Sequence, residues 1–354
     1  MIDRLTPLLA QRPWLLADGA MGSTLFERGL TSGDAPELWN TDFPERIAEL
    51  HRSFVEAGAD IILTNSFGGT RHRLKLHKAE GRVAELNERA ASLARTEAHH
   101  SPRTVLVGGS MGPTGEILEP LGPLSAEAAR ESFAEQAVAL ARGGADILWI
   151  ETMSSVEETE AAIAGARTAG LPVVATLSFD TNGRTMMGIA PIDLAELHRR
   201  HQLAACGSNC GVGPAELVAC IVNLANASED SAVLVAKANC GIPQFIDGAI
   251  RFSGTPEMMA EYARLSFDAG ARIIGGCCGT TPEHLKVMRR ALNAHTRGAK
   301  PDLALIESRL GAISTGAMAQ LRGELDRQAG AAPGATGRRL TGRRKATDGR
   351  TRSA

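Results

Sequence analysis

The chain has 354 residues, 44% of them hydrophobic, and a net charge of −2. This composition supports a large buried core, and no stretch approaches the roughly 20 consecutive apolar residues of a membrane-spanning helix. The charge is uneven, because residues 330–354 carry seven basic residues and one acid while the remainder carries −8. The body of the protein therefore lacks the basic excess that nucleic-acid binding requires.

Residues 1–7 contain an acid early and no long apolar run, which argues against a secretory signal peptide. Six cysteines in a chain of this length then indicate a reducing compartment in which thiols stay free. We expect a cytoplasmic protein without membrane association.

Short apolar runs of β-type residues alternate with segments of helical period along the chain. Because these runs are apolar throughout, they predict strands that are buried on both faces. The eight predicted strands cover residues 14–17, 61–64, 105–107, 147–150, 173–177, 203–206, 233–236 and 272–274. Predicted helices include residues 45–57, 126–142, 156–169, 214–226 and 256–269.

This alternation predicts an α/β fold, a single (β/α)8 TIM barrel over residues 1–295. An open doubly wound sheet is the alternative, but the segment after the first strand, Asp18-Gly19-Ala20-Met21-Gly22, lacks the glycine fingerprint of that fold. A C-terminal helical extension is expected over residues 296–329, with one helix at 303–327. Residues 330–354 are predicted to be a basic disordered tail.

Polar and cysteine side chains follow the C-terminal ends of the predicted strands, and in a barrel these ends meet on one face. They include Asp18, Asn65-Ser66, Glu151, Asn209-Cys210, Asn239-Cys240 and Cys277-Cys278. Strands six and eight are close neighbours around the ring, so Cys210 is expected near Cys277 and Cys278. Three thiolates with one open position indicate a catalytic zinc, one per chain, at the C-terminal face.

A zinc ion held by three thiolates is suited to binding a fourth thiol and lowering its pKa. This favours sulfur alkylation over water activation, for which histidine and carboxylate ligands are usual. Asp18 and Glu151 share the same rim. Alkylation of a thiolate needs no general base, so we expect these carboxylates to hold a substrate ammonium, which indicates an amino thiol as substrate.

The cysteine motifs and the segment after the first strand resemble the homocysteine S-methyltransferase family. The matching segments are Asp18-Gly19-Ala20-Met21-Gly22, Thr64-Asn65-Ser66-Phe67, Gly207-Ser208-Asn209-Cys210 and Gly275-Gly276-Cys277-Cys278-Gly279-Thr280-Thr281-Pro282. The family includes betaine–homocysteine methyltransferases, S-methylmethionine-dependent enzymes and the homocysteine module of cobalamin-dependent methionine synthase. The resemblance covers residues 10–295 and implies zinc ligation by Cys210, Cys277 and Cys278.

The resemblance also implies roles for residues around the cysteines. Asp18 and Glu151 would hold the ammonium of homocysteine, and the backbone of Gly19-Ala20 its carboxylate. The remaining substrate-side positions are Asn209, which would support the zinc loop, and Asn239, which would approach the metal when homocysteine is absent. Cys240 stands where the family often has alanine, and it is kept outside the ligand set.

The methyl donor is the open question. Betaine is usually held by aromatic faces, and animal betaine enzymes have tyrosines where this chain has Gly68 and Thr152. The donor-side candidates are Trp39, Ser66 and Phe67. We expect betaine or a related small onium compound, with a methylcorrinoid on a separate protein as the alternative.

Two other classes of protein remain as alternatives. A metal-dependent hydrolase or lyase would need histidine ligands together with carboxylates on several strands, and none of the nine histidines stands at a predicted strand end. A non-catalytic zinc- or thiol-binding protein would keep the cysteines but need neither Asp18 nor Glu151. The expected partners are homocysteine and a methyl donor, with a second copy of the chain or a corrinoid protein as a further partner.

Overall fold

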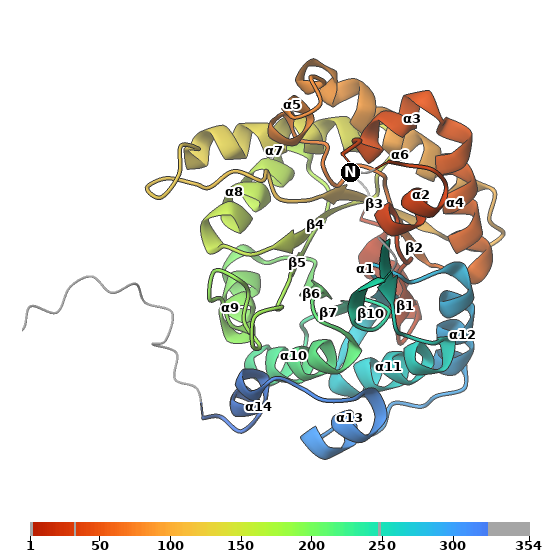
Figure 1. The fold of residues 1–354 in the computed structure, drawn as a ribbon, viewed down its shortest axis with the longest axis vertical. Helices are drawn as coiled ribbons and strands as arrows, with labels where there is room; N and C mark the ends of the chain where they lie inside the picture. Colours follow the sequence, from red (N-terminus) through yellow and green to blue (C-terminus); the bar gives the residue numbers. More distant parts are fainter. Residues whose placement is uncertain (1–2, 32, 247–248, 325–354) are drawn as a thin grey trace, which may run out of the picture.

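The computed structural model describes residues 3–31, 33–246 and 249–324. Parallel strands form a barrel with helices around it, in the order β1-β10-β7-β6-β5-β4-β3-β2 (Figure 1). The strands are β1 (Leu15–Leu16), β2 (Ile61–Leu63), β3 (Leu106–Met111), β4 (Ile147–Met153), β5 (Val173–Leu177), β6 (Ala205–Cys210), β7 (Leu234–Ala238) and β10 (Ala271–Gly276). The predicted (β/α)8 barrel is confirmed.

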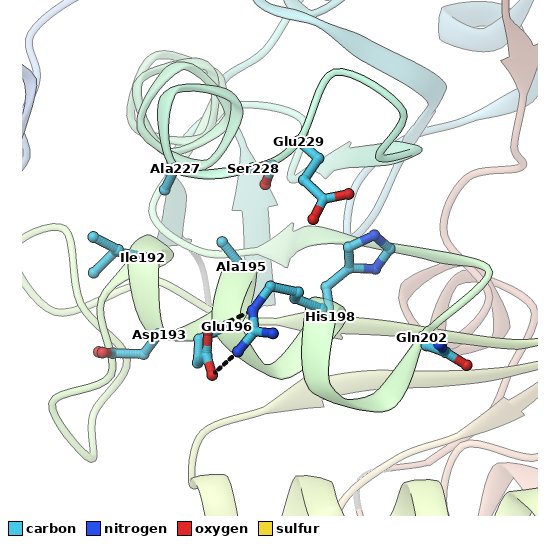
Figure 2. Close-up of a pocket in the computed structure, with 10 residues that line it drawn as sticks. Ile192, Asp193, Ala195, Glu196, His198, Gln202, Ala227, Ser228 and Glu229 are labelled. Carbon is cyan, nitrogen blue, oxygen red and sulfur yellow. Dashed lines mark hydrogen bonds and ion pairs between the residues drawn. The ribbon is translucent and has the colours of Figure 1, made fainter.

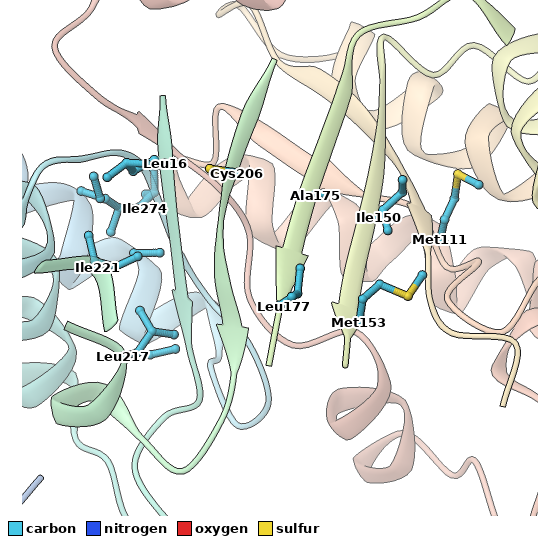
Figure 3. Close-up of a cluster of buried hydrophobic side chains, with 14 of the residues drawn as sticks. Leu16, Met111, Ile150, Met153, Ala175, Leu177, Cys206, Leu217, Ile221 and Ile274 are labelled. Atoms are coloured by element: carbon cyan, nitrogen blue, oxygen red, sulfur yellow. The ribbon is translucent and has the colours of Figure 1, made fainter. Parts of the chain in front are cut away.

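Helices cover the outside of the barrel, and an apolar layer lies between them and the strands. Figure 3 shows part of this layer, with Ile150 and Leu177 on the strands and Leu217 and Ile221 on a helix. The outer helices are α4 (Pro44–Ala57), α6 (Val83–His99), α7 (Ala126–Arg142), α8 (Val156–Ala166), α9 (Pro191–His201), α10 (Pro214–Ala227), α11 (Pro256–Ala269) and α12 (Pro282–Asn293). No helix in the described ranges is long and apolar enough to cross a membrane.

The interior of the barrel is closed at the end where the strands begin. Helix α1 (Leu5–Gln11) packs Leu5, Leu8 and Leu9 into the cluster of inward-facing side chains that includes Trp149 and Val235. Loops at the opposite end carry short helical segments, which are α2 (Gly22–Glu27), η1 (Pro36–Leu38), α3 (Trp39–Asp42), α5 (Arg71–Lys75) and η2 (Glu80–Arg82). The barrel therefore offers a site on its C-terminal face.

Three local expectations differ from the structure. The sixth strand was expected at residues 203–206 but runs from Ala205 to Cys210, because buried polar residues continue the ladder to β7. The sequence did not predict the antiparallel hairpin of β8 (Pro243–Ile246) and β9 (Ala249–Phe252) after β7. The short η3 (Arg167–Ala169) ends the segment that was expected to be helical to residue 169.

The single helix expected at residues 303–327 is wrong. Two helices, α13 (Leu303–Leu310) and α14 (Thr315–Leu321), are separated at Gly311, whose φ of 101° ends the first. Ser314 begins the second by accepting a hydrogen bond from the N–H of Ala317. Both helices pack against α10. The expected tail at 330–354 lies outside the described residues.

Asp60 holds the seam at which β1 and β2 close the barrel. The two strands are joined by a single parallel bridge between Ala17 and Ile61. The Asp60 side chain is fully buried there and accepts a hydrogen bond from the N–H of Leu16 at 2.9 Å. Its oxygens also pair with three arginines on separate segments, Arg12 at 2.7 Å, Arg103 at 3.0 Å and Arg289 at 2.5 Å.

We therefore predict that Asp60→Ala lowers the free energy of unfolding by about 3 kcal/mol, because it leaves three arginines and a strand N–H without their acceptor. Asp60→Asn should cost less, since an amide oxygen still accepts the hydrogen bond from Leu16. Denaturant unfolding followed by circular dichroism measures both changes. Glu56→Ala, an exposed change on α4, is the control, and an equal loss in that variant would contradict the role of Asp60.

Candidate active site

Three cysteines meet at the C-terminal face of the barrel. Cys210 ends β6, and Cys277 and Cys278 follow β10; both strands pair with β7. The Sγ atom of Cys210 lies 3.0 Å from that of Cys277 and 4.0 Å from that of Cys278, and all three atoms are within 4.8 Å of one another. Tetrahedral zinc–thiolate bonds of about 2.3 Å place sulfur atoms roughly 3.8 Å apart. The separations here lie on both sides of that value, from 3.0 Å to no more than 4.8 Å, so small side-chain shifts would let the trio hold such an ion.

The pKa values of the three thiols are also shifted in different directions. Hydrogen bonding to Cys277 raises the pKa of Cys210, whereas a hydrogen bond from Cys210 lowers the pKa of Cys278 to about 4. Clustered thiolates repel one another, and a divalent cation would balance their charge. The trio is therefore a candidate metal centre by both its geometry and its chemistry.

Two asparagines fix the cysteine-bearing loops. Asn239 donates from its amide to the carbonyl of Gly211 at 2.7 Å and accepts from the N–H of Cys278 at 3.1 Å. Asn209 accepts from the N–H of Thr152 at 2.8 Å and donates to its hydroxyl at 2.7 Å. Asn209 thus supports the cysteine loop, and Asn239 connects the two loops through the backbone.

Cys240 lies beside the trio but outside it. Its Sγ atom is 3.2 Å from Nε2 of His284, whose Nδ1 accepts the backbone N–H of Thr281 at 3.1 Å. That contact makes Nδ1 an acceptor, so a neutral imidazole carries its proton on Nε2. Burial raises the pKa of Cys240 to about 11. Cys240 thus contacts the side chain that caps the start of α12.

Lys237 is the residue of the site that the sequence analysis missed. It is a fully buried lysine on β7, and its Nζ lies 2.7 Å from Oδ1 of Asp18. The other oxygen of Asp18 accepts the N–H of Leu63 at 2.7 Å. A lysine inside an otherwise apolar strand, two residues before Asn239, was the available signal. Asp18 is therefore already paired, and its charge is balanced inside the barrel.

Glu151 is the buried carboxylate that this pairing leaves uncompensated. It ends the inward-facing part of β4 and accepts a hydrogen bond from the hydroxyl of Ser110 at 2.5 Å. Burial raises its pKa to about 7, although the charge of Lys237 opposes the shift. When both buried carboxylates, Asp18 and Glu151, are ionised, Lys237 neutralises one of them. The second negative charge can be neutralised by a bound cation.

The segment Gly19-Ala20 lies beside these groups but is less available than expected. The N–H of Ala20 donates to the carbonyl of Thr280 at 3.0 Å, so it has a partner within the protein. A Cβ atom at Gly19 would lie 2.4 Å from the same carbonyl oxygen, which explains why glycine is needed there. Because the N–H of Ala20 is already bonded, the expected contact with the substrate carboxylate depends on the backbone of Gly19.

A cavity of about 310 Å³ joins these elements. The residues that line it include the cysteine trio, Asp18, Gly19, Ala20, Glu151, Lys237, Ser66 and Phe67. The hydroxyl of Ser66 donates to the carbonyl of Ser110 at 2.7 Å, so it braces the wall. Phe67 is 37% exposed and is the Phe, Tyr or Trp residue among the described lining residues.

Trp39 was expected on the donor side, but it does not line this cavity. It is buried in the outer core, where its ring centroid lies 4.9 Å from that of Phe43. The guanidinium carbon of Arg46 lies 4.9 Å from the ring centre. Because its ring already has a cationic partner, Trp39 is removed from the donor-side candidates.

A larger cavity of about 570 Å³ lies elsewhere, between α9 and the end of α10 (Figure 2). His198 on α9 and Glu229 in the loop just after α10 line this groove. Burial lowers the pKa of His198. The groove contains none of the cysteines or buried carboxylates of the barrel mouth, so its size does not make it the reactive site.

The fold and the site define a (β/α)8 barrel with three clustered cysteines, a candidate metal centre, beside a small cavity lined by charged groups. The homocysteine S-methyltransferase family model matches residues 15–292. The chain belongs to the homocysteine S-methyltransferase family.

Its relatives include much longer proteins. The methionine synthases of Mycobacterium tuberculosis and Mycobacterium leprae are 31% and 30% identical over 81% and 83% of this chain. The chain spans about a quarter of their length, since 25% of each is covered.

A shorter relative matches over nearly its whole length. The metallated form of the homocysteine methyltransferase MmuM from Escherichia coli is 27% identical with a TM-score of 0.67, over 81% of this chain and 99% of that chain. The oxidized form is 29% identical with a TM-score of 0.66, over 81% of this chain and 98% of that chain.

We predict that Asn239→Ala weakens zinc binding by roughly 10- to 100-fold, because the two cysteine loops lose the side chain that connects them. Competition with a chromogenic chelator measures the affinity. Cys278→Ala should abolish stoichiometric binding, whereas Asn226→Ala, an exposed change on α10, should leave it unaltered. Wild-type affinity in Asn239→Ala would contradict the connecting role.

Proposed function

We propose that the protein is a zinc-dependent homocysteine S-methyltransferase that forms methionine. The observation that carries this proposal is the placement of Cys210, Cys277 and Cys278, within 4.8 Å of one another, in a cavity that also contains the uncompensated carboxylate of Glu151. The catalytic unit is the barrel, residues 1–295, and the C-terminal helices α13 and α14 are an extension packed on its outside.

The three cysteines would hold Zn²⁺, whose charge, when the ion is bound, would keep the sulfur of homocysteine as a thiolate at neutral pH. The metallated form of MmuM supports this assignment by analogy. The protein's own residues orient the substrate. Glu151 receives the ammonium, and the ion pair of Asp18 with Lys237 borders it.

The favoured donor is a small onium compound such as betaine. A cavity of about 310 Å³ is at the lower end for small-ligand sites, so it suits two small molecules rather than a large cofactor. The sulfur attacks the methyl carbon, and the departing amine or thioether leaves with the electron pair of the broken bond. This step moves no proton, so no general base is needed.

A second candidate donor is a methylcorrinoid carried by a separate protein. Large apolar side chains are exposed on loops that follow the C-terminal ends of the strands, namely Ile117, Leu121, Met186, Met187, Val212 and Ile242. Such exposure around the mouth of a barrel is typical of a surface that another protein covers. The similarity to methionine synthases also favours this candidate.

A donor panel tests the function. The purified protein should contain about one zinc per chain and convert homocysteine to methionine. Turnover with betaine alone supports the small-donor mechanism, whereas turnover that requires methylcobalamin or a methylcorrinoid protein supports the second candidate. Absence of methionine with every donor would contradict the proposed function.

Glu151→Gln should raise the KM for homocysteine by roughly 10- to 100-fold, the scale of a lost charge-assisted hydrogen bond. Zinc content should not change. Initial-rate kinetics measure the KM, with Glu157→Gln, an exposed change at the start of α8, as the control. Methylation of 3-mercaptopropionate as efficient as that of homocysteine would contradict ammonium recognition.

A further inference from the structure

The candidate active-site cavity is lined by further charged groups to which the proposed binding of homocysteine assigns no role. Glu37, Arg73 and His77 line the same cavity as the cysteine trio. They come from the loops after β1 and β2, with Glu37 on η1 and Arg73 on α5. We call these three residues the outer group.

Arg73 is a cation whose electrostatic neighbour in the cavity wall is the buried carboxyl group of Glu37, with which it forms no ion pair. Its backbone N–H donates to the hydroxyl of Thr70 at the start of α5, but its guanidinium makes no hydrogen bond or ion pair within the described part of the chain. A Cβ atom at Gly115 would lie 3.0 Å from its Nη1, so the guanidinium rests against the loop after β3. A half-buried cation at a cavity wall is poised to bind an anion.

Glu37 places a carboxyl group near this cation; burial raises its pKa, while the hydrogen bond from Gly68 and the charges of Arg73 and His77 favour its ionised form. Its side chain is buried, and its Oε1 accepts the N–H of Gly68 at 2.6 Å. A Cβ atom at Gly68 would lie 3.0 Å from that oxygen, so the carboxylate lies where a side chain at position 68 would extend. At this position, where animal betaine enzymes have a tyrosine, the carboxyl group of Glu37 forms the cavity wall. Glu37 and Arg73 together form a pair of opposite charges that are not bonded to each other.

We propose that the outer group is the methyl-donor subsite, and that it selects a zwitterionic onium carboxylate. Arg73, with His77 beside it, binds the donor's carboxylate, while Glu37 attracts the positive onium centre. This inference rests on the proposed function. In the transfer, an S–CH₃ bond forms to homocysteine and the C–N or C–S bond of the onium breaks. The leaving amine or thioether keeps the electron pair and the carboxylate that Arg73 holds.

A comparison of two donors in two proteins tests this role. Dimethylsulfonioacetate carries the carboxylate, whereas trimethylsulfonium has the same reacting methyl groups without it. The readout is the ratio of kcat/KM for the two donors, with homocysteine saturating. In the wild type the ratio should favour dimethylsulfonioacetate, and Arg73→Gln should lower it ~10- to 100-fold, the scale of a charge-assisted pair.

Two further variants separate charge from structure. Arg73→Lys keeps the charge but loses the forked geometry, so its ratio should fall between those of wild type and Arg73→Gln. Arg71→Gln removes the neighbouring arginine, which is exposed and pairs with Glu135 at 2.7 Å, so its ratio should equal that of the wild type.

An unchanged ratio in Arg73→Gln would overturn the inference, and this includes the case in which kcat/KM falls equally with both donors. Methionine formation from trimethylsulfonium in the wild type shows independently that the proposed function holds. If no donor in the panel, methylcobalamin included, yields methionine, the proposed function itself fails and the inference fails with it.

Discussion

The buried ion pair between Asp18 and Lys237 is the contact on which both the barrel and its site depend. Nζ of Lys237 lies 2.7 Å from one oxygen of Asp18, and the N–H of Leu63 lies 2.7 Å from the other. These bonds connect the ends of β1, β2 and β7. They matter most for β1, because that strand contains only two residues. Burying two charges is costly unless each is paired and hydrogen-bonded, and here both conditions are met.

The same pair determines the electrostatics of the cavity. Because Lys237 balances Asp18, the remaining charge belongs to Glu151, whose pKa burial raises to about 7. A substrate ammonium next to Glu151 would stabilise its ionised form. The sequence indicated two equivalent carboxylates at this rim, whereas the structure makes one of them a structural partner of a lysine.

The sequence predicted the eight strands and the meeting of the three cysteines, since both follow from apolar periodicity and from the common face of strand ends in a barrel. It did not predict contacts that depend on packing between distant segments. Lys237 appeared as an isolated charge in an apolar run, and its partner lies 219 positions away. Trp39 was close in sequence to the site but turned into the core, because Phe43 and Arg46 on the next turns cover its ring.

The charged groups that line the cavity suit the proposed reaction, in which opposite charges meet. A thiolate and an onium cation both lose their charge as the methyl group moves, so a water-poor cavity does not penalise the transition state as it penalises separated ions. The protein's task is then to hold the two reactants in line. In that proposal, the charges of Glu151 and Arg73, which both line the cavity, anchor the groups that do not react. In the proposed reaction, these charged groups would take over the recognition of a cationic donor in a cavity with one Phe, Tyr or Trp side chain, Phe67, among the described lining residues.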